Sequence, residues 1–252
     1  MTPRPKIAIS GLSKSFGDKQ VLAGLDLDIA PGESIAVIGQ SGTGKSVMLK
    51  CILGLLAPEA GSIRVDGEEV VGASARDLHR IRAKFGMLFQ GSALFDSLPV
   101  WRNVTFGLTQ GRLREAGAMR ARATQLLEKV GLGAQVLDLK PSELSGGMQK
   151  RVALARAIAP GPDILFFDEP TTGLDPIRAH VIDNLITSLV EDLGTTAVTI
   201  THDLASARRV AHRVAMLHEG RIVWDGSVEA LDCSGHPVVE QFVEGRAEGA
   251  IG

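Results

Sequence analysis

The sequence contains no tyrosine and only two cysteines and two tryptophans among its 252 residues. Cys51 and Cys233 form no Cys-x-x-Cys pair or other spacing typical of a metal site or a disulfide framework. No apolar run approaches the roughly 18 to 20 residues that a membrane-spanning helix needs. The opening residues MTPRPKIAIS also lack the apolar region of a secretory signal. These absences predict a cytosolic protein with reduced thiols that does not itself cross a bilayer.

An excess of one charge is also missing. The chain has 27 Lys and Arg against 29 Asp and Glu, for a formal net charge of -2. This balance argues against an electrostatically driven nucleic-acid binder and against a disordered acidic protein. The length and the 44% hydrophobic content are sufficient for one large or two small domains with a buried core.

Apolar runs alternate with helical patterns along most of the chain, which favours an α/β fold with a mainly parallel sheet. Four runs are apolar on both faces, as strands covered by helices on both sides must be. These predicted strands are residues 35–38, 164–167, 197–200 and 214–217. Apolar residues recur at helical spacing in residues 46–56, 118–130 and 147–158.

Two regions depart from this alternation. Residues 7–16 and 21–29 read as alternating strands joined by a Gly17-Asp18 turn, which predicts an N-terminal antiparallel β layer. Residues from about 90 to 144 are rich in arginine and in helical periodicity, and we interpret them as an inserted helical subdomain. The predicted domain covers residues 1–235, and residues 236–252 form a C-terminal tail.

Residues 39–46 read GQSGTGKS and fit the pattern GxxxxGK[S/T] between a predicted strand and a predicted helix. The backbone N–H groups of such a loop face one anion at the positive end of the helix. The Lys45 ammonium reaches the terminal phosphates, and the Ser46 hydroxyl can bind Mg²⁺. A glycine-rich turn with a surface lysine is the alternative. The strand before the loop and the helix after it favour the phosphate-binding interpretation.

A pair of carboxylates, Asp168 and Glu169, follows the buried run 164–167. The ends of strands are where open α/β sheets place their chemistry. Asp168 suits the positioning of a metal ion, and Glu169 suits a general base that orients or deprotonates water. Adjacent residues of a strand point to opposite sides, so the two acids can have different roles. A solvated turn is the alternative interpretation of this pair alone.

Residues 144–149, LSGGMQ, place a Ser-Gly-Gly loop at the start of a helix, which is a second anion-binding helix terminus. One chain needs only one such terminus for its own phosphates, so the second implies a partner. This signature segment resembles that of the nucleotide-binding subunits of ATP-binding cassette (ABC) transporters. An N-cap by Ser145 is also expected, but it does not explain the two glycines.

The resemblance extends over almost the whole chain. It implies a P-loop NTPase (RecA-like) core with a mainly parallel sheet, an N-terminal antiparallel β layer and an inserted helical subdomain. It further implies ATP hydrolysis with Mg²⁺ in a head-to-tail dimer of two copies. The residues it assigns to nucleotide are Gly39, Ser41, Gly42, Thr43, Gly44, Lys45 and Ser46 of one copy, with Ser145, Gly146 and Gly147 of the other.

Four further positions match the family. Gln90 follows the strand-like FGMLF and corresponds to the glutamine that touches metal and water. His202, after the run 197–200, corresponds to the histidine that contacts the γ-phosphate, whereas the five other histidines are interpreted as structural or solvated. Asp175 ends a Gly-Leu-Asp loop that spans the dimer interface. Phe16 falls where an aromatic stacks on adenine, and a buried strand residue is its alternative interpretation.

The segment after Gln90 carries the apolar residues Leu94, Phe95, Leu98, Val100 and Trp101. The resemblance implies that this region binds a coupling helix of a membrane subunit. Filling the core of the helical subdomain is the alternative. The same segment, together with the late residues 241–249 (QFVEGRAEG), is similar to that of MlaF-type cassettes, which serve phospholipid transport in bacterial envelopes. That similarity implies an integral permease of the MlaE type, an Mce protein and in some systems a STAS-domain partner, at the cytoplasmic face of the inner membrane.

Other functions stay open at this point. The chain could serve an importer or exporter of small solutes, because the motor residues would be the same. It could also be a soluble ABC protein without a channel, or a switch that binds nucleotide without hydrolysis. The presence of Lys45, Gln90, Glu169 and His202 together argues against an inactive site. A nucleotide kinase has no use for a second helix-terminal phosphate site.

Overall fold

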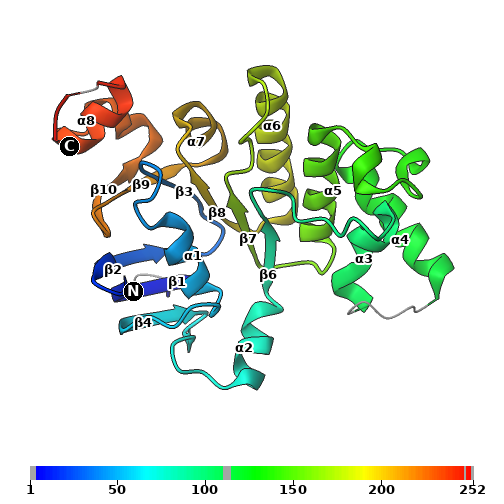
Figure 1. The fold of residues 1–252 in the computed structure, drawn as a ribbon, viewed down its shortest axis with the longest axis horizontal. Helices are drawn as coiled ribbons and strands as arrows, with labels where there is room; N and C mark the ends of the chain where they lie inside the picture. Colours follow the sequence, from blue (N-terminus) through cyan, green and yellow to red (C-terminus); the bar gives the residue numbers. More distant parts are fainter. Residues whose placement is uncertain (1–3, 110–114, 247, 251–252) are drawn as a thin grey trace. The chain divides into compact units, whose positions relative to one another are not determined.

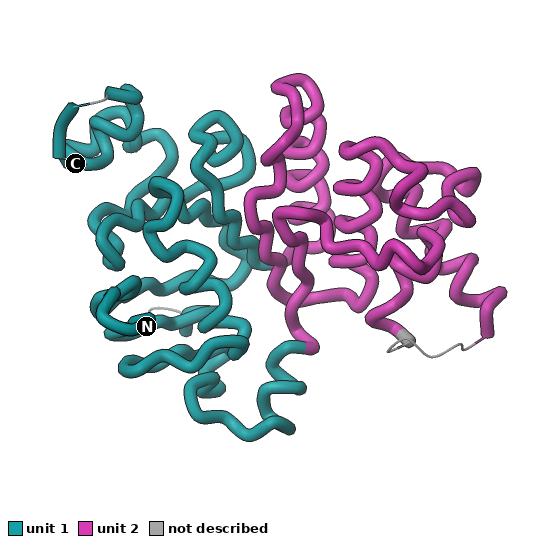
Figure 2. The backbone as a smooth tube through the Cα atoms, viewed as in Figure 1, with its two compact units in different colours: residues 1–82, 196–252 teal, residues 83–195 magenta. Residues whose placement is uncertain are grey.

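The computed structural model describes residues 4–109, 115–246 and 248–250 (Figure 1). The chain divides into two compact units (Figure 2). Unit 1 consists of residues 1–82 and 196–252, and unit 2 consists of residues 83–195. Unit 2 therefore interrupts unit 1 in the sequence.

The first sheet of unit 1 is antiparallel, with the strand order β2-β1-β4-β5. Its strands are β1 (Ile7–Phe16), β2 (Lys19–Ile29), β4 (Ala60–Val65) and β5 (Glu68–Glu69). Phe16 pairs with Lys19 across the turn that Gly17 and Asp18 form. The predicted N-terminal antiparallel layer is confirmed.

The second group of strands in unit 1 follows the order β10-β9-β3-β8. Its members are β3 (Ser34–Ile38), β8 (Thr196–Thr201), β9 (Arg213–His218) and β10 (Arg221–Ser227). Strand β3 pairs in parallel with both β8 and β9, and β10 pairs with β9 in antiparallel. Every residue of β3 and β8 is buried, as predicted for runs that are apolar on both faces.

The helices of unit 1 are short. They are α1 (Lys45–Ile52), α2 (Ala75–Arg82), α7 (Leu204–Val210), the 3₁₀ helix η3 (Val228–Cys233) and α8 (Pro237–Glu244). Helix α1 ends at Ile52, whereas the apolar spacing predicted a helix as far as residue 56. Gly54 has a φ of 64° and donates its N–H to the Cys51 carbonyl at 2.9 Å, which ends the helix in a left-handed turn.

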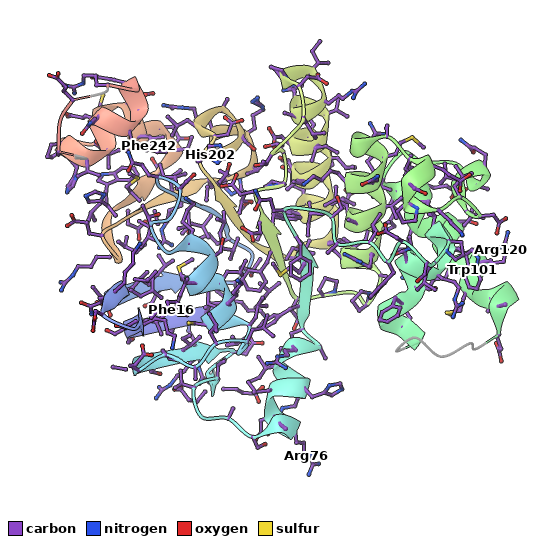
Figure 3. All side chains as sticks on the ribbon, viewed as in Figure 1. Phe16, Arg76, Trp101, Arg120, His202 and Phe242 are labelled. Carbon is purple, nitrogen blue, oxygen red and sulfur yellow. The ribbon has the colours of Figure 1, made fainter. Side chains whose placement is uncertain are left out.

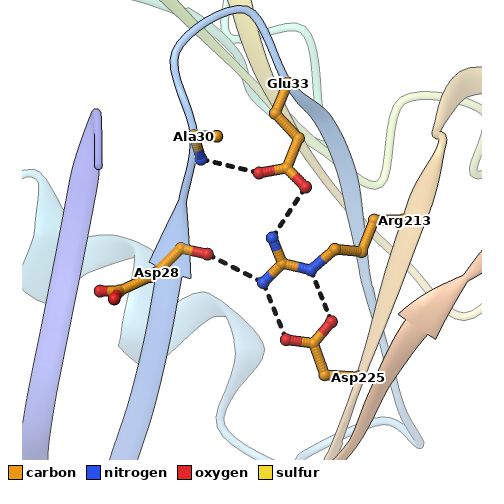
Figure 4. Close-up of polar contacts among 5 residues, drawn as sticks. All are labelled: Asp28, Ala30, Glu33, Arg213 and Asp225. Atoms are coloured by element: carbon orange, nitrogen blue, oxygen red, sulfur yellow. Dashed lines mark hydrogen bonds and ion pairs between the residues drawn. The ribbon is translucent and has the colours of Figure 1, made fainter. Parts of the chain in front are cut away.

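Arg213 on β9 joins three segments of unit 1 (Figure 4). Its Nε and Nη2 donate to the two Asp225 oxygens at 2.5 and 2.8 Å, and its Nη1 donates to Glu33 at 2.7 Å. Nη2 also donates to the Asp28 carbonyl at 2.8 Å. The Asp225 and Glu33 carboxylates raise the pKa of the Arg213 guanidinium, against the effect of burial. Arg213 thus ties β10, β2 and the start of β3 together.

Unit 2 contains the parallel pair β6 (Phe85–Leu88) and β7 (Ile164–Asp168). Its helices are α3 (Val100–Thr109), α4 (Ala116–Lys129), η1 (Ala134–Val136), η2 (Pro141–Glu143), α5 (Gly146–Ile158) and α6 (Pro176–Leu193). Helices α4 and α5 confirm the helical spacing of residues 118–130 and 147–158. Helices α3, α4, η1 and η2 lie in the segment 90–144, and α8 lies in the segment 236–252. The domain boundaries drawn from the sequence stay a prediction.

The core of unit 2 forms around β7. Phe166 and Phe167 are fully buried, and the Phe166 ring meets Phe85 of β6 edge-on with 5.2 Å between centroids. Arg120 of α4 lies 5.7 Å from the Trp101 ring of α3 and forms a bidentate pair with Asp138 at 2.5 and 2.6 Å (Figure 3). No helix within the described residues has both the length and the apolarity needed to span a membrane.

Candidate functional site

The phosphate loop, residues 39–46, connects β3 to α1 in unit 1 and requires glycine at two positions. Gly39 has a φ of 152°, and a Cβ there would lie 2.4 Å from the Leu217 carbonyl oxygen of β9. Gly44 has a φ of 107°, and a Cβ there would lie 2.9 Å from the Val21 carbonyl oxygen of β2. A side chain at either position would collide with backbone. The loop therefore packs directly against two neighbouring strands.

Lys45 is only 6% exposed, and its side chain folds over the inside of the phosphate loop. Its Nζ donates to the carbonyls of Gly39 and Gln40 at 2.6 and 2.7 Å. The Thr43 hydroxyl donates to the same Gln40 carbonyl at 2.9 Å. Helix α1 begins without a side-chain cap and without an acidic residue in its first turn. A helix start of this kind attracts an anion.

His202, labelled in Figure 3, follows β8 at the carboxyl end of the parallel strands, the same end at which the phosphate loop follows β3. Ile38 pairs with Thr201, so Gly39 and His202 are the residues that follow this pair on the two strands. His202 is exposed. Asp203 fixes the turn after it, because its carboxylate accepts the Ala205 N–H at 2.8 Å and caps α7. The parallel pairing thereby brings the predicted histidine to the predicted loop.

Phe16 ends β1 in unit 1, and its ring is 49% exposed. The Lys14 ammonium lies 5.3 Å from the centroid of the ring. That ammonium donates to Glu59 Oε1 at 2.6 Å, and Glu59 Oε2 accepts the Ser15 N–H at 2.8 Å. The exposure of Phe16 excludes the alternative interpretation as a buried core residue. Its stacking on adenine stays a prediction.

Asp168 and Glu169 lie half-buried at the end of β7 in unit 2. Glu169 has a φ of 49°, which is uncommon for a residue other than glycine and typical of constrained functional positions. The Thr172 hydroxyl donates to Glu169 Oε2 at 2.9 Å. Thr172 thus orients the predicted general base through a contact that no sequence motif indicates.

Gln90 follows β6 in unit 2, and its side chain is exposed. Its main-chain carbonyl accepts a hydrogen bond from Lys150 Nζ of α5. Arg156 of the same helix donates to the carbonyls of Ser92 and Ala93, each at 2.7 Å. Two cations of α5 therefore hold the loop that begins at Gln90. Neither contact could be predicted from the sequence, because no local feature of a basic residue on a helix identifies its partner in a distant loop.

The segment after Gln90 divides its apolar residues between core and surface. Val100 is fully buried at the start of α3. Phe95 is 42% exposed although its ring meets Phe106 with 4.3 Å between centroids. Leu94, Leu98 and Trp101 are half-buried. Filling of the core is confirmed for Val100, whereas the binding of a coupling helix by the exposed part of the segment stays a prediction.

Ser145 caps helix α5 in unit 2, as expected. Its hydroxyl oxygen accepts the Met148 N–H at 3.4 Å. The two glycines that follow have no comparable role inside the chain. A Cβ on Gly147 would meet no atom within 4 Å, and a Cβ on Gly146 would meet only a methyl of Leu174 at 3.9 Å. The chain itself would accommodate the Cβ of an alanine at both positions.

A pocket of about 270 Å³ opens beside the signature segment, between α5 and α6. Ser145, Gly147 and Arg178 contribute to its wall. Asp175 caps α6 there, since its carboxylate accepts the Arg178 N–H at 3.0 Å and pairs with the Arg178 side chain at 3.2 Å. Asp175 thus has a structural role in addition to the one predicted for it.

Each unit brings part of the predicted site together. Unit 1 holds the phosphate loop, Phe16 and His202. Unit 2 holds Gln90, Ser145, Gly146, Gly147, Asp168, Glu169 and Asp175. Within residues 4–109, 115–246 and 248–250, no group of three or more His, Cys, Asp or Glu could hold a metal ion.

Comparisons with known proteins agree with this geometry. A family model described as "ABC transporter" matches residues 22–172. The chain is 42% identical to "Probable ribonucleotide transport ATP-binding protein mkl" of Mycobacterium leprae, over 98% of this chain and 71% of that protein. The chain belongs to the ABC transporter family. It is an ATP-binding subunit that hydrolyses ATP, as the signature segment and the phosphate loop predicted.

Two further relatives of this cassette are informative. It is 39% identical to "Intermembrane phospholipid transport system ATP-binding protein MlaF" of Haemophilus influenzae, over 97% of this chain and 92% of that protein. It is also similar to a solved dimeric ATP-binding cassette in a post-hydrolysis state bound to ADP and Pi. The TM-score is 0.80 with 32% identity, over 88% of this chain and 98% of that one. The predicted P-loop NTPase fold is confirmed.

Proposed function

We propose that two copies of this cassette bind ATP and Mg²⁺ in a head-to-tail dimer and drive an integral membrane permease of the MlaE type that moves phospholipid. The main support for the nucleotide site is the phosphate loop at the carboxyl end of β3. Gly39 and His202 follow the paired residues Ile38 and Thr201, and Lys45 lies over the loop carbonyls.

The phosphate loop binds the triphosphate in this proposal. The N–H groups of residues 41–44 and of the start of α1 surround the phosphates, because the positive end of the helix points at them. The Lys45 ammonium moves from the loop carbonyls to the terminal phosphates. Phe16 stacks on the adenine through its exposed ring.

The donor set fits Mg²⁺. Ser46 offers a hydroxyl oxygen, Asp168 a carboxylate oxygen and Gln90 an amide oxygen, and magnesium prefers such oxygen ligands. When bound, the ion supplies positive charge that neutralises the phosphates during transfer. Ser46 is exposed at the first turn of α1, and Gln90 is exposed after β6.

The hydrolytic roles fall to two residues in addition to Gln90. Glu169 orients and deprotonates the attacking water, with its carboxylate fixed by Thr172. His202, at the carboxyl end of β8, donates to the γ-phosphate. A base and a charge-stabilising donor are the two groups that water attack on a phosphate requires.

The dimer follows from the signature segment. The absence of close neighbours beside Gly146 and Gly147 allows another molecule to approach the start of α5 closely. Ser145, Gly146 and Gly147 of one copy then cover the γ-phosphate held by the phosphate loop of the other copy, and Asp175 lies at the same interface. The similar solved cassette is a dimer, which supports this arrangement.

Phospholipid is the substrate that we favour, because the chain matches almost the full length of a relative named for phospholipid transport. The exposed Phe89, Phe95 and Leu108 of unit 2 offer apolar contacts for a helix of the permease. Through the permease the cassette would lie at the cytoplasmic face of the inner membrane, with Mce and STAS-domain proteins as further partners. The name of the Mycobacterium leprae relative makes ribonucleotide transport the second candidate.

A reconstitution experiment distinguishes the two substrates. The cassette is purified together with its permease from detergent-extracted membranes and inserted into vesicles of phosphatidylethanolamine and phosphatidylglycerol. We expect ATP-dependent transfer of a fluorescent phospholipid and no ATP-dependent uptake of radiolabelled ribonucleotides. Uptake of ribonucleotides without lipid transfer would replace phospholipid as the substrate. A cassette that is recovered without any membrane protein would contradict the permease proposal.

A further inference from the structure

We infer that Lys150 is a positioning residue for Gln90: its buried side chain fastens the Gln90 carbonyl to the helix that begins at the signature segment. The inference rests on the roles proposed above for Gln90 and Glu169. Lys150 lies on α5, outside both the phosphate loop and the carboxylate pair, and this inference gives it a function.

The first observation is geometric. Lys150 is 5% exposed, and its Nζ donates to the Gln90 carbonyl although the two residues are 60 positions apart in the sequence. A lysine is rarely buried unless it is paired, because removing an ammonium from water costs several kcal/mol. The burial of Lys150 therefore requires a compensating partner, and the Gln90 carbonyl is one.

The second observation is electrostatic. Burial lowers the pKa of Lys150, while the charges of Asp168 and Glu169 raise it. The two carboxylates therefore favour the charged form of this buried lysine. Lys150 thus contacts Gln90 and is affected by the charges of Asp168 and Glu169, but it does not contact substrate in any step of the proposed mechanism.

The third observation concerns the helix that carries Lys150. Helix α5 begins at Ser145 of the signature segment, and Lys150 and Arg156 both hold the loop after β6. Arg156 holds the carbonyls of Ser92 and Ala93, and burial alone lowers its pKa. Of these two cations, Lys150 is the one that the charges of the carboxylate pair also affect. A nucleotide bound at Ser145 would therefore be linked to the direction of the Gln90 side chain through one rigid helix.

Steady-state kinetics on the full chain tests this inference. Lys150→Met keeps the length of the side chain but removes the donor and the charge. We expect kcat for ATP to fall on the order of tenfold to a hundredfold, since a misplaced catalytic group loses rate steeply. The KM for ATP should change by less than about twofold, because the phosphate loop is unaltered. Lys150→Arg should recover most of the lost kcat.

The matched control is Lys129→Met, which removes an exposed lysine at the end of α4 in the same unit. Its kcat should equal that of the wild type. Thermal unfolding and binding of a fluorescent ATP analogue establish that each variant is folded. If Lys150→Met does not fold, Lys150→Gln takes its place, because the shorter amide should show the same loss of kcat at unchanged KM.

The inference is overturned if the Lys150 variants turn over ATP like Lys129→Met. It is also overturned if KM rises while kcat is unchanged, or if a folded Lys150→Arg recovers nothing. Glu169→Gln is measured alongside to separate this inference from the proposed function. Normal turnover of Glu169→Gln would refute the proposed site. Slow turnover of Glu169→Gln with normal turnover of Lys150→Met would refute only the role of Lys150.

Discussion

At the scale of single residues, the glycines of the two anion-binding segments have different physical reasons. Gly39 and Gly44 adopt positive φ angles and lie against backbone oxygens of β9 and β2. Gly146 and Gly147 lie at the start of a helix and have no positive φ; a Cβ would meet only a Leu174 methyl at 3.9 Å on Gly146 and no atom within 4 Å on Gly147. The first pair is required by the fold of this chain, whereas no contact within the described residues requires the second pair, which the proposed second copy would explain.

Gly147→Ala should therefore separate folding from assembly. We expect the thermal stability to be unchanged or raised by up to about 1 kcal/mol, because alanine favours a helix over glycine. ATP-dependent dimerisation should be weakened, which size-exclusion chromatography measures. Gly39→Ala is the counterpart: its clash should lower stability by about 1 to 3 kcal/mol, as overpacking does. Full dimerisation of Gly147→Ala would show that the partner does not need this space.

Lys45→Ala should weaken nucleotide binding itself. The ammonium is buried over the loop carbonyls, so it is held beside the position of the phosphates. A hydrogen bond to a charged group contributes about 1.5 to 3 kcal/mol, which corresponds to a loss of ATP affinity of about tenfold or more. Isothermal titration calorimetry measures the change. Lys50→Ala, an exposed lysine of α1, is the control and should bind as the wild type does. Equal affinities of the two variants would refute the role of Lys45.

At the scale of helices and strands, the sequence predicted the elements whose signal is local. The runs 35–38, 164–167, 197–200 and 214–217 are strands, as expected for short runs whose apolar residues on both faces are buried in a sheet covered by helices. The sequence predicted that α1 continues to Leu56, because the apolar spacing does, but the helix ends at Ile52. Leu55 is in fact 55% exposed, and Gly54 ends the helix.

Contacts between distant segments could not be predicted from the sequence. Arg213 binds Glu33 across 180 positions, and Lys150 binds the Gln90 carbonyl across 60. No local sequence pattern around an arginine or a lysine identifies the distant residue that it contacts. The pairing of Ile38 with Thr201 also depends on strand order, so the site residues were predicted from motifs and their neighbours were not.

Arg213→Met should destabilise unit 1. The substitution removes donors to Asp225, Glu33 and the Asp28 carbonyl and leaves these acceptors partly buried. We expect a loss of about 1 to 3 kcal/mol, the cost of unsatisfied polar groups. The midpoint of urea unfolding measures the effect. Arg221→Met on the exposed end of β10 is the control. Equal midpoints for the two variants would contradict the importance of the Arg213 contacts.

At the scale of the whole molecule, the proposed chemistry is divided between the two units and between two copies of the chain. The phosphate loop and His202 belong to unit 1, whereas the carboxylate pair and the signature segment belong to unit 2. Neither unit contains all the groups that water attack on a phosphate requires. ATP binding should therefore be separable from hydrolysis, and hydrolysis from dimerisation, by single substitutions.

Glu169→Gln tests that separation. The substitution removes the general base but keeps the side-chain volume and an acceptor for Thr172. We expect turnover, measured as phosphate release, to fall by about 10²-fold to 10⁴-fold, the usual contribution of general base catalysis. Because ATP then persists between the two copies, light scattering after size-exclusion chromatography should detect a dimer with ATP and a monomer with ADP. Adding Lys45→Ala should abolish the dimer, since the phosphate loop no longer holds the nucleotide. A Glu169→Gln protein that stays monomeric at saturating ATP would mean that the signature segment does not complete the site of a second copy.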